Sequence, residues 1–138
     1  MKSAIVEAPN VGASEKITIN LGVVDLGQVD LLVREGFYSN RTDMIRTAIR
    51  NQLSKHAAAV RVAVDHQALR LGLQQISRAE LEQARADEEP LNIRVVGLVR
   101  IASDVSPQLA RASIASVKVL GVFQASPAVR RALADRIS

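Results

Sequence analysis

Cysteine is absent from the 138 residues, and aromatic residues make up only 2% of them. Without cysteine the chain has no disulfide framework, no thiolate metal site and no cysteine nucleophile. With no tryptophan, one tyrosine and two phenylalanines, it has few rings on which bases could stack. Its two histidines, His56 and His66, leave little for acid–base or metal chemistry. We therefore expect no enzyme, with no catalytic residue, no metal site and no bound cofactor.

Long hydrophobic runs are also missing, since none reaches the roughly 18 residues that a membrane span needs. The first ten residues contain an acidic residue and a proline where a signal peptide needs an apolar core. These absences predict a cytoplasmic protein without a membrane partner. A hydrophobic content of 48% with 23% charged residues predicts that most of the chain folds.

Basic residues outnumber acidic ones, and the formal net charge is +4. A basic balance is a weak indication of an anionic partner. The excess is concentrated in residues 91–138, where seven basic residues stand against two acidic ones. That excess can serve a second DNA contact, a contact to an acidic protein or solubility, and solvated surface charge is the interpretation we favour.

Residues 1–14 show no periodicity and predict a mobile arm. The next residues alternate strictly between polar and apolar, which predicts a short strand with one apolar and one polar face. The apolar face carries Ile17, Ile19 and Leu21. The polar face carries Lys16, Thr18 and Asn20.

Two helices are expected after this strand. Asp25 and Gln28 stand at capping-box spacing, and Gly36 can end the first helix in a left-handed conformation. Asn40 is a good N-cap for the second helix, with Asp43 in its first turn. Both helices carry an apolar stripe. Together with the strand, these stripes form the expected dimer core: Ile17, Ile19, Leu21, Val29, Leu32, Val33, Met44, Ile45, Ala48, Ile49 and Leu53.

This strand–helix–helix unit, residues 15–56, cannot fold alone. A lone strand leaves its backbone groups unpaired, and units of about 40 residues usually need a staple or a partner. The chain offers no cysteine for a staple. The simplest solution is an intertwined homodimer in which the two strands pair antiparallel about a two-fold axis.

The ordered set Lys16–Leu21, Glu35–Phe37 and Ser39–Arg46 resembles the ribbon-helix-helix DNA-binding family of the CopG/Arc/MetJ type. The resemblance implies that a two-stranded ribbon enters the major groove of double-stranded DNA. By position, the bases would be contacted by Lys16, Thr18 and Asn20, whose donors and acceptors suit base edges. A phosphate would be held at the start of the second helix, by Asn40, Arg41 and Thr42.

The stretch 57–90 predicts a helical connector. Apolar residues recur at three- and four-residue steps from Ala57 to Leu71, as a continuation of the second helix or after a restart at Ala57. Ser77 and Glu80 stand at capping-box spacing and predict a further helix behind them.

Residues 91–138 contain two copies of one unit. Val96–Val99 matches Leu120–Phe123 at an offset of 24, and Ser106–Ala110 resembles Ser126–Arg130 at an offset of 20. Each copy predicts a strand, a turn and a helix opened by Ser-Pro. Gly97 and Gly121 fall within the strands and indicate bulges or close packing.

The expected fold is therefore mainly α with short β. An N-terminal ribbon-helix-helix dimer precedes central helices and a C-terminal α+β segment of two strand–turn–helix repeats. The expected function is a homodimeric, sequence-specific transcriptional regulator, most simply a repressor, able to assemble further on DNA. The C-terminal segment would serve oligomerisation or regulation, or bind a protein partner. Two alternatives stay open: an antitoxin that represses its own operon, and an assembly protein that binds no DNA.

Overall fold

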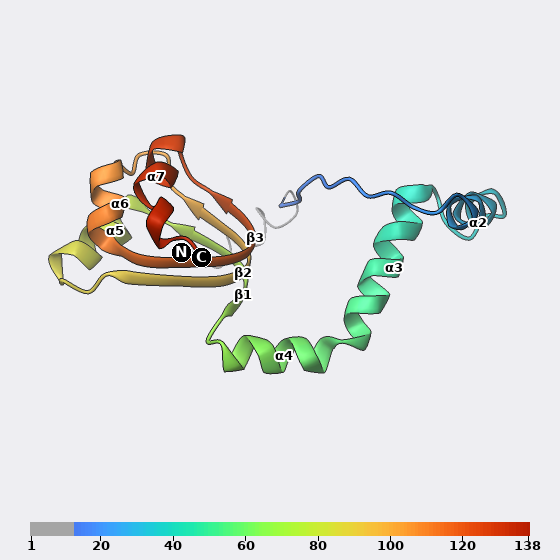
Figure 1. The fold of residues 1–138 in the computed structure, drawn as a ribbon, viewed down its shortest axis with the longest axis horizontal. Coiled ribbons are helices and arrows are strands. Elements are labelled where there is room, and N and C mark those ends of the chain that lie inside the picture. The colour runs from blue at the N-terminus through green and yellow to red at the C-terminus, as the bar shows by residue number, and fades with distance from the viewer. Residues whose placement is uncertain (1–12) are drawn as a thin grey trace. The chain divides into compact units, whose positions relative to one another are not determined.

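The computed structural model describes residues 13–138 (Figure 1), and most of the predicted mobile arm, residues 1–12, lies outside them. The described chain divides into two compact units. Residues 16–63 form the first, which we call the helical unit. Residues 13–15 and 64–138 belong to the second, which we call the sheet unit. None of the helices in residues 13–138 has the length and apolar character needed to cross a bilayer.

The first helix of the helical unit, α2 (Val23–Arg34), begins two residues before the predicted capping box. Its N-cap is Gly22, without a side-chain cap, so the predicted box of Asp25 and Gln28 is wrong. Its end follows the prediction. Gly36 has φ +88°, and Phe37 N–H donates to the Leu32 carbonyl at 3.0 Å. Glycine reaches this left-handed conformation without strain, and the backbone bond satisfies an end carbonyl of α2.

The second helix, α3 (Arg41–Lys55), has the predicted cap, because the Asn40 side chain accepts from Asp43 N–H at 2.8 Å. His56 ends it, and α4 (Ala57–His66) restarts directly afterwards. The helical connector predicted up to residue 90 stops at α4. Residues Arg70–Ile76 form strand β1 instead, so the apolar spacing that continues to Leu71 does not mark a helix there.

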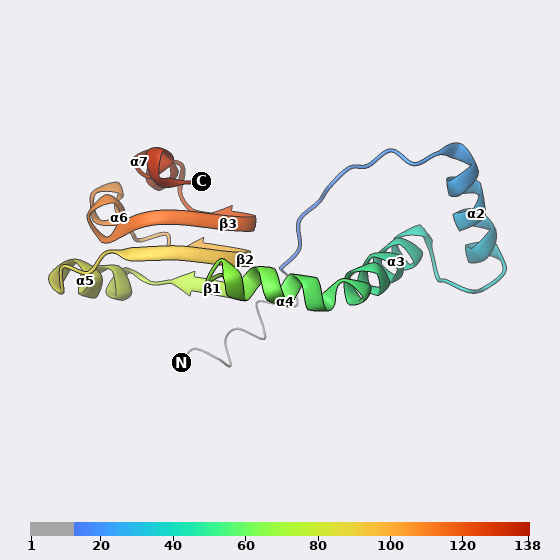
Figure 2. The same ribbon diagram turned by 60° about the horizontal axis from the view of Figure 1, so that its bottom comes forward.

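Three parallel strands build the sheet unit, in the order β1, β2 (Leu91–Ile101) and β3 (Ile114–Gln124). The helices α5 (Arg78–Ala86), α6 (Pro107–Ser113) and α7 (Pro127–Ala132) follow β1, β2 and β3 in turn. All three helices lie at one end of the sheet unit (Figures 1 and 2). The prediction of a mainly α protein with short β is corrected to a mixed α/β protein, because two strands run for 11 residues each.

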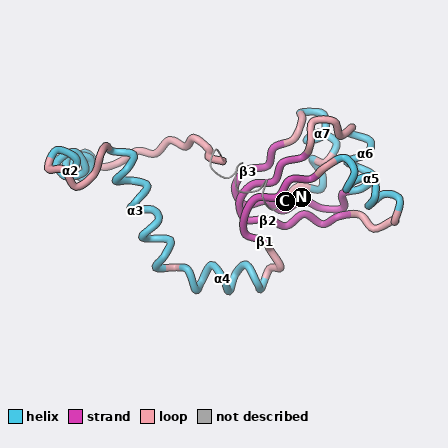
Figure 3. The backbone as a smooth tube through the Cα atoms, turned by 180° about the vertical axis from the view of Figure 1, so that it is seen from behind, coloured by secondary structure: helices cyan, strands magenta, loops and turns pink. Residues whose placement is uncertain are grey.

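Three glycines stand side by side across the sheet, where Gly72 pairs with Gly97 and Gly97 with Gly121. Their φ angles are +136°, +139° and +125°, a region that other residues rarely adopt. The two long strands change direction about midway along their length (Figures 1 and 3). A Cβ atom on Gly97 would lie 2.1 Å from the Gly72 carbonyl oxygen, and one on Gly121 equally close to that of Gly97. The close packing predicted at Gly97 and Gly121 is therefore confirmed.

The paired glycines Gly72, Gly97 and Gly121, which we call the glycine column, reveal a third copy of the repeat. The first copy runs through β1 into α5, whose Ser77 cap accepts from Glu80 N–H at 3.1 Å. Ser106 and Ser126 cap α6 and α7 in the same way, each before a proline in the first turn. The prediction of two strand–turn–helix repeats is corrected to three, and the capping box of Ser77 and Glu80 is confirmed.

Apolar side chains from all three copies share one core. Val95 and Val99 of β2 and Val117 of β3 are fully buried, as are Leu81 of α5 and Leu133 after α7. Every second residue of β2 around the glycine therefore points inward. On the opposite side of β2, Val96 and Arg100 are partly exposed, whereas Leu98 is buried with 8% exposure.

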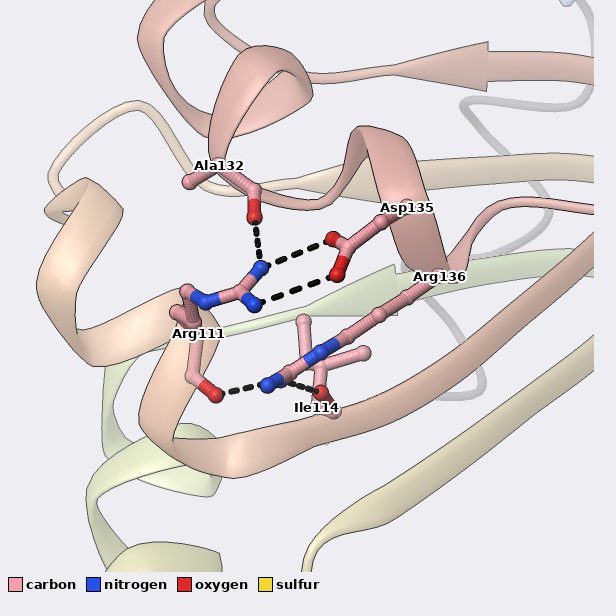
Figure 4. Close-up of polar contacts among 5 residues, drawn as sticks. All are labelled: Arg111, Ile114, Ala132, Asp135 and Arg136. Carbon is pink, nitrogen blue, oxygen red and sulfur yellow. Dashed lines mark hydrogen bonds and ion pairs between the residues drawn. The ribbon is translucent and has the colours of Figure 1, made fainter.

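Arginines tie the C-terminal end to this core (Figure 4). Arg111 of α6 donates to both carboxylate oxygens of Asp135, at 2.8 and 3.1 Å, and to the Ala132 carbonyl. Arg136, at the end of the 3-10 helix η1 (Ala134–Arg136), donates to the carbonyls of Arg111 and Ile114. The Arg111 guanidinium lowers the pKa of Asp135 through this hydrogen bond. These contacts join the second and third repeats.

Candidate nucleic-acid interface

The segment predicted to form the ribbon, Lys16–Leu21, is exposed along its whole length. Its apolar side chains are strongly exposed, at 73% for Ile17, 56% for Ile19 and 40% for Leu21. In the described single chain, the segment pairs with no strand. Three aliphatic side chains in water next to unpaired backbone are unfavourable in an isolated chain. The segment has no regular secondary structure in the single chain, so the strand expected there stays a prediction that requires a partner.

The predicted base-contact residues Lys16, Thr18 and Asn20 alternate with these aliphatic residues and are also exposed. Alternation places them on one face if the segment is extended. An ammonium group, a hydroxyl and a carboxamide on one face offer hydrogen-bond donors and acceptors of different geometry. Such a mixed set suits base edges better than a row of equal charges, which attracts phosphate without regard to sequence.

Of the residues predicted for the dimer core, only Val29 is buried in the single chain, with 8% exposure. Four are half-buried between the two helices: Leu32, Val33, Met44 and Ile45. The other six are exposed: Ile17, Ile19, Leu21, Ala48, Ile49 and Leu53. Further apolar side chains of this unit, which the predicted core did not include, are exposed as well, among them Leu31 at 56% and Phe37 at 69%. The helical unit thus lacks a closed core of its own.

The start of α3 is ordered by two reciprocal hydrogen bonds. Asn40 Oδ1 accepts from Asp43 N–H at 2.8 Å, while Asp43 Oδ2 accepts from Ser39 N–H at 3.0 Å. The amides of Arg41 and Thr42 belong to the first turn, where a helix supplies no acceptor. These two amides and the positive end of the helix dipole point out of the N-terminus, an arrangement that suits an anion.

Arg41, predicted as a phosphate contact, has a protein partner that the sequence did not reveal. Its Nε and Nη2 atoms donate to the two carboxylate oxygens of Asp30 in α2, at 2.7 and 2.9 Å. This hydrogen bond lowers the pKa of Asp30 and raises that of Arg41. The pair fixes α2 against the start of α3, and the Nη1 atom of Arg41 takes no part in it. The eleven-residue separation gave no periodic signal by which to find it.

Within residues 13–138, no group of three or more histidine, aspartate or glutamate side chains comes together. The exposed surface of the helical unit carries the polar side chains of Lys16, Thr18 and Asn20 and the free amides at the start of α3.

Comparisons with known proteins bear on this interface. Residues 12–130 match the model of the Ribbon-Helix-Helix transcriptional regulator family. Searches of curated proteins and of solved structures find no match. The family match covers the helical unit and continues through all three strands of the sheet unit. Because it spans most of the sequence, the chain belongs to the Ribbon-Helix-Helix transcriptional regulator family.

Proposed function

We propose that this protein is a homodimeric, sequence-specific DNA-binding regulator that represses transcription. The observation that carries the proposal is the exposed Lys16–Leu21 segment, where aliphatic and polar side chains alternate beside a helical unit without a closed core. A second copy supplies what is missing, because two such segments can pair antiparallel about a two-fold axis. Pairing removes the aliphatic side chains from water and leaves the polar face outward.

In the proposed complex, Lys16, Thr18 and Asn20 of each strand contact base edges in the major groove. The lysine ammonium donates to guanine acceptors, the asparagine amide suits adenine, and the threonine methyl suits thymine. The α3 N-terminus holds a phosphate through the backbone amides near Asn40 and Thr42. Arg41 adds Nη1 to that contact while its pair with Asp30 keeps the helix start in place.

The folded sheet unit favours a regulator over an antitoxin. Antitoxins of this fold neutralise their toxin with a C-terminal part that is usually charged and disordered. Here Val95, Val99 and Val117 are completely buried in a core shared by three repeats. We therefore assign the sheet unit a regulatory or oligomerisation role. An assembly protein without DNA preference is the other alternative, and a comparison of two DNA sequences separates it from a regulator.

The proposal is tested by fluorescence anisotropy on the DNA upstream of the protein's own gene and on a shuffled sequence, across a salt series. We expect strong discrimination at physiological salt. Asn20→Ala should weaken specific binding by about 1–3 kcal/mol, or roughly 5- to 150-fold, because its amide no longer bonds a base edge. Gln52→Ala, an exposed polar residue of α3, is the matched control and should bind like wild type. Equal, steeply salt-dependent binding to both DNAs would show that charge alone is acting and would overturn sequence-specific readout.

A further inference from the structure

The sheet unit has two open edges among the described residues. Its three strands run in the order β1, β2, β3, so β1 and β3 each have one side without a neighbouring strand (Figure 2). An unpaired strand edge presents free backbone N–H and C=O groups and readily pairs with another strand. Each edge is therefore a candidate contact surface for a further strand.

At the β1 edge, the glycine column leaves empty a space that is filled at its other two glycines. A Cβ atom on Gly97 would lie 2.1 Å from the Gly72 carbonyl oxygen, and one on Gly121 would lie 2.1 Å from the Gly97 carbonyl oxygen. Each of these glycines thus receives the glycine carbonyl of the preceding strand. Beside Gly72 the same position has no atom within 4 Å. The β1 edge can therefore receive a strand whose own glycine carbonyl approaches Gly72.

The β3 edge is covered at its beginning and open further along. Ile137 forms a parallel bridge with Val117, and Ser138 N–H donates to the Val117 carbonyl at 2.9 Å. From Val119 to Gln124, no strand within residues 13–138 pairs with the outer side of β3. Because β3 repeats the register of β2 and Gly121 shares the positive φ of the column, its carbonyl faces this open side.

The open part of β3 has the register of β1. Through β2, Arg70 lies in the row of Val119, and Gln75 lies in the row of Gln124. A strand that continued the repeat past β3 would place residues 70–75 of a second copy beside residues 119–124. Those rows begin two residues after the row that Ile137 occupies. The C-terminal residues and such a strand would therefore share the β3 edge without overlap.

Two exposed leucines mark one of these rows. Leu71 is 64% exposed and Leu120 is 52% exposed, and they are the only large apolar side chains of the three strands that are exposed. They lie in register with Val96, which stands between them and is partly buried. Contact between a β3 edge and a β1 edge would make the two leucines neighbours and remove both from water, which favours association.

The chain enters β1 without pairing with its outer side. Gln67, three residues before β1, accepts from Arg94 Nε through its carbonyl at 3.1 Å and from Lys118 Nζ through its side chain at 2.9 Å. Both donors belong to the neighbouring strands, so the entering segment lies over the face of the sheet. The first three residues of β1, Arg70–Gly72, are all exposed.

We propose that the sheet units of two copies join head to tail, with residues 119–124 of one copy pairing in parallel with residues 70–75 of the next. The Gly121 carbonyl then takes the place beside Gly72 that is empty in a single chain. Such an interface uses different surfaces on the two copies, so it continues from copy to copy unless it closes into a ring. The inference concerns the sheet unit alone and does not rest on the DNA-binding function.

The test is disulfide formation between two single-cysteine variants of the full chain, which has no cysteine of its own. Neighbouring strands lie about 4.8 Å apart, a separation that a disulfide can bridge. Leu71→Cys incubated with Leu120→Cys under mild oxidation should give a mixed linked pair, and so should Gln75→Cys with Gln124→Cys. A size tag on one variant distinguishes mixed from like pairs. All four side chains are exposed, so the core stays intact.

Exchanged partners are the matched control. Leu71→Cys with Gln124→Cys, and Gln75→Cys with Leu120→Cys, are offset by four residues, which separates their Cα atoms by about 14 Å and prevents a disulfide. Equal yields from matched and exchanged partners, or no linked product at all, would overturn the proposal. Single variants that link to themselves as well as the matched partners do would show antiparallel pairing of like edges, contrary to the proposal.

Sedimentation velocity measures the consequence for assembly. Wild type should form larger species as its concentration rises. Leu120→Lys places a charge in the row of the two leucines and should weaken this association about tenfold or more. Gln108→Lys, on the exposed surface of α6, adds the same charge away from both edges and should associate like wild type. A wild type that keeps one size, or a Leu120→Lys variant that assembles like wild type, would contradict the head-to-tail contact.

Discussion

Single residues at the glycine column decide whether the repeats can stack. Gly72 and Gly97 share a positive φ, but their surroundings differ. A Cβ atom on Gly97 would collide with the Gly72 carbonyl oxygen, while one on Gly72 would meet nothing within 4 Å. Among the described residues no strand pairs with β1 on the side away from β2, so Gly72 needs glycine there for backbone conformation alone. Gly97 needs it for conformation and for space.

This difference predicts unequal costs for the same substitution. Gly72→Ala should lower the free energy of unfolding by about 1–3 kcal/mol through backbone strain. Gly97→Ala should cost at least a further ~1–3 kcal/mol, because overpacking is added to the strain. Urea denaturation followed by circular dichroism measures both. Equal losses for the two variants would show that the close approach of neighbouring strands does not contribute.

At Asp135, charge predicts a dependence of stability on pH. Its hydrogen bond with Arg111 lowers the folded-state pKa below the ordinary aspartate value of about 3.9. The folded state then binds fewer protons than the unfolded state, so the stabilisation is complete above about pH 4 and is lost as the pH falls through the lowered pKa. Asp135→Asn should therefore lose less stability than wild type as the pH falls, which denaturation midpoints measured between about pH 2 and 5 would show.

Asp104→Asn is the control for that series, since Asp104 is an exposed aspartate in the loop between β2 and α6 and belongs to none of the ion pairs described. The loss of stability of this variant at low pH should match that of wild type. An Asp135→Asn profile that runs parallel to wild type down to the lowest pH would contradict the role given to the Arg111 contact.

At the scale of elements, local signals in the sequence predicted helix ends well. Asn40, Ser77, Ser106 and Ser126 all cap the helices expected from them, because a cap depends on residues only three positions apart. The end of α2 was also predicted from a nearby residue, because Gly36 follows the last turn of the helix directly. The start of α2 was mispredicted because Asp25 can sit inside the first turn as well as before it.

Strand β1 was missed because helical spacing and a short strand compete for the same apolar residues. Leu71 and Leu73 flank Gly72 as Val96 and Leu98 flank Gly97. That apolar–Gly–apolar pattern, followed by a serine cap, was a usable signal for a third repeat. Pairing with β2 overrides local preference here, since strand formation depends on a neighbour distant in sequence.

The α3 cap yields a prediction for the candidate interface. Asn40→Ala should cost about 0.5–2 kcal/mol of stability, because Asp43 N–H loses its acceptor. Asn40→Ser keeps a side-chain oxygen at the cap and should recover most of that stability. Thermal denaturation compares the three proteins. If Asn40→Ser is as unstable as Asn40→Ala, the capping bond is not what holds the start of α3.

At the scale of the whole molecule, a single chain accounts for the start of α3 in the proposed site but not for a paired ribbon. The strand at Lys16–Leu21 stays a prediction, because that segment is irregular in the single chain. The capped start of α3 was predicted from the sequence, because capping is a local pattern. The ion pair of Arg41 with Asp30 was not, because it depends on how two helices pack. The dimer is a proposal that follows from what one chain lacks: only one of eleven predicted core residues is buried.

Antiparallel pairing of the two Lys16–Leu21 segments is the central claim, and interchain distances between spin labels test it most directly. Because the chain lacks cysteine, labels can be placed one at a time at Lys16→Cys, Thr18→Cys and Asn20→Cys. Moving both labels by one residue along antiparallel strands changes their separation by about 7 Å, twice the rise per residue. Antiparallel pairing therefore predicts distances that grow by about 14 Å for every two residues that the label moves away from the two-fold axis. One distance shared by all three positions, or no interchain distance at all, would contradict it.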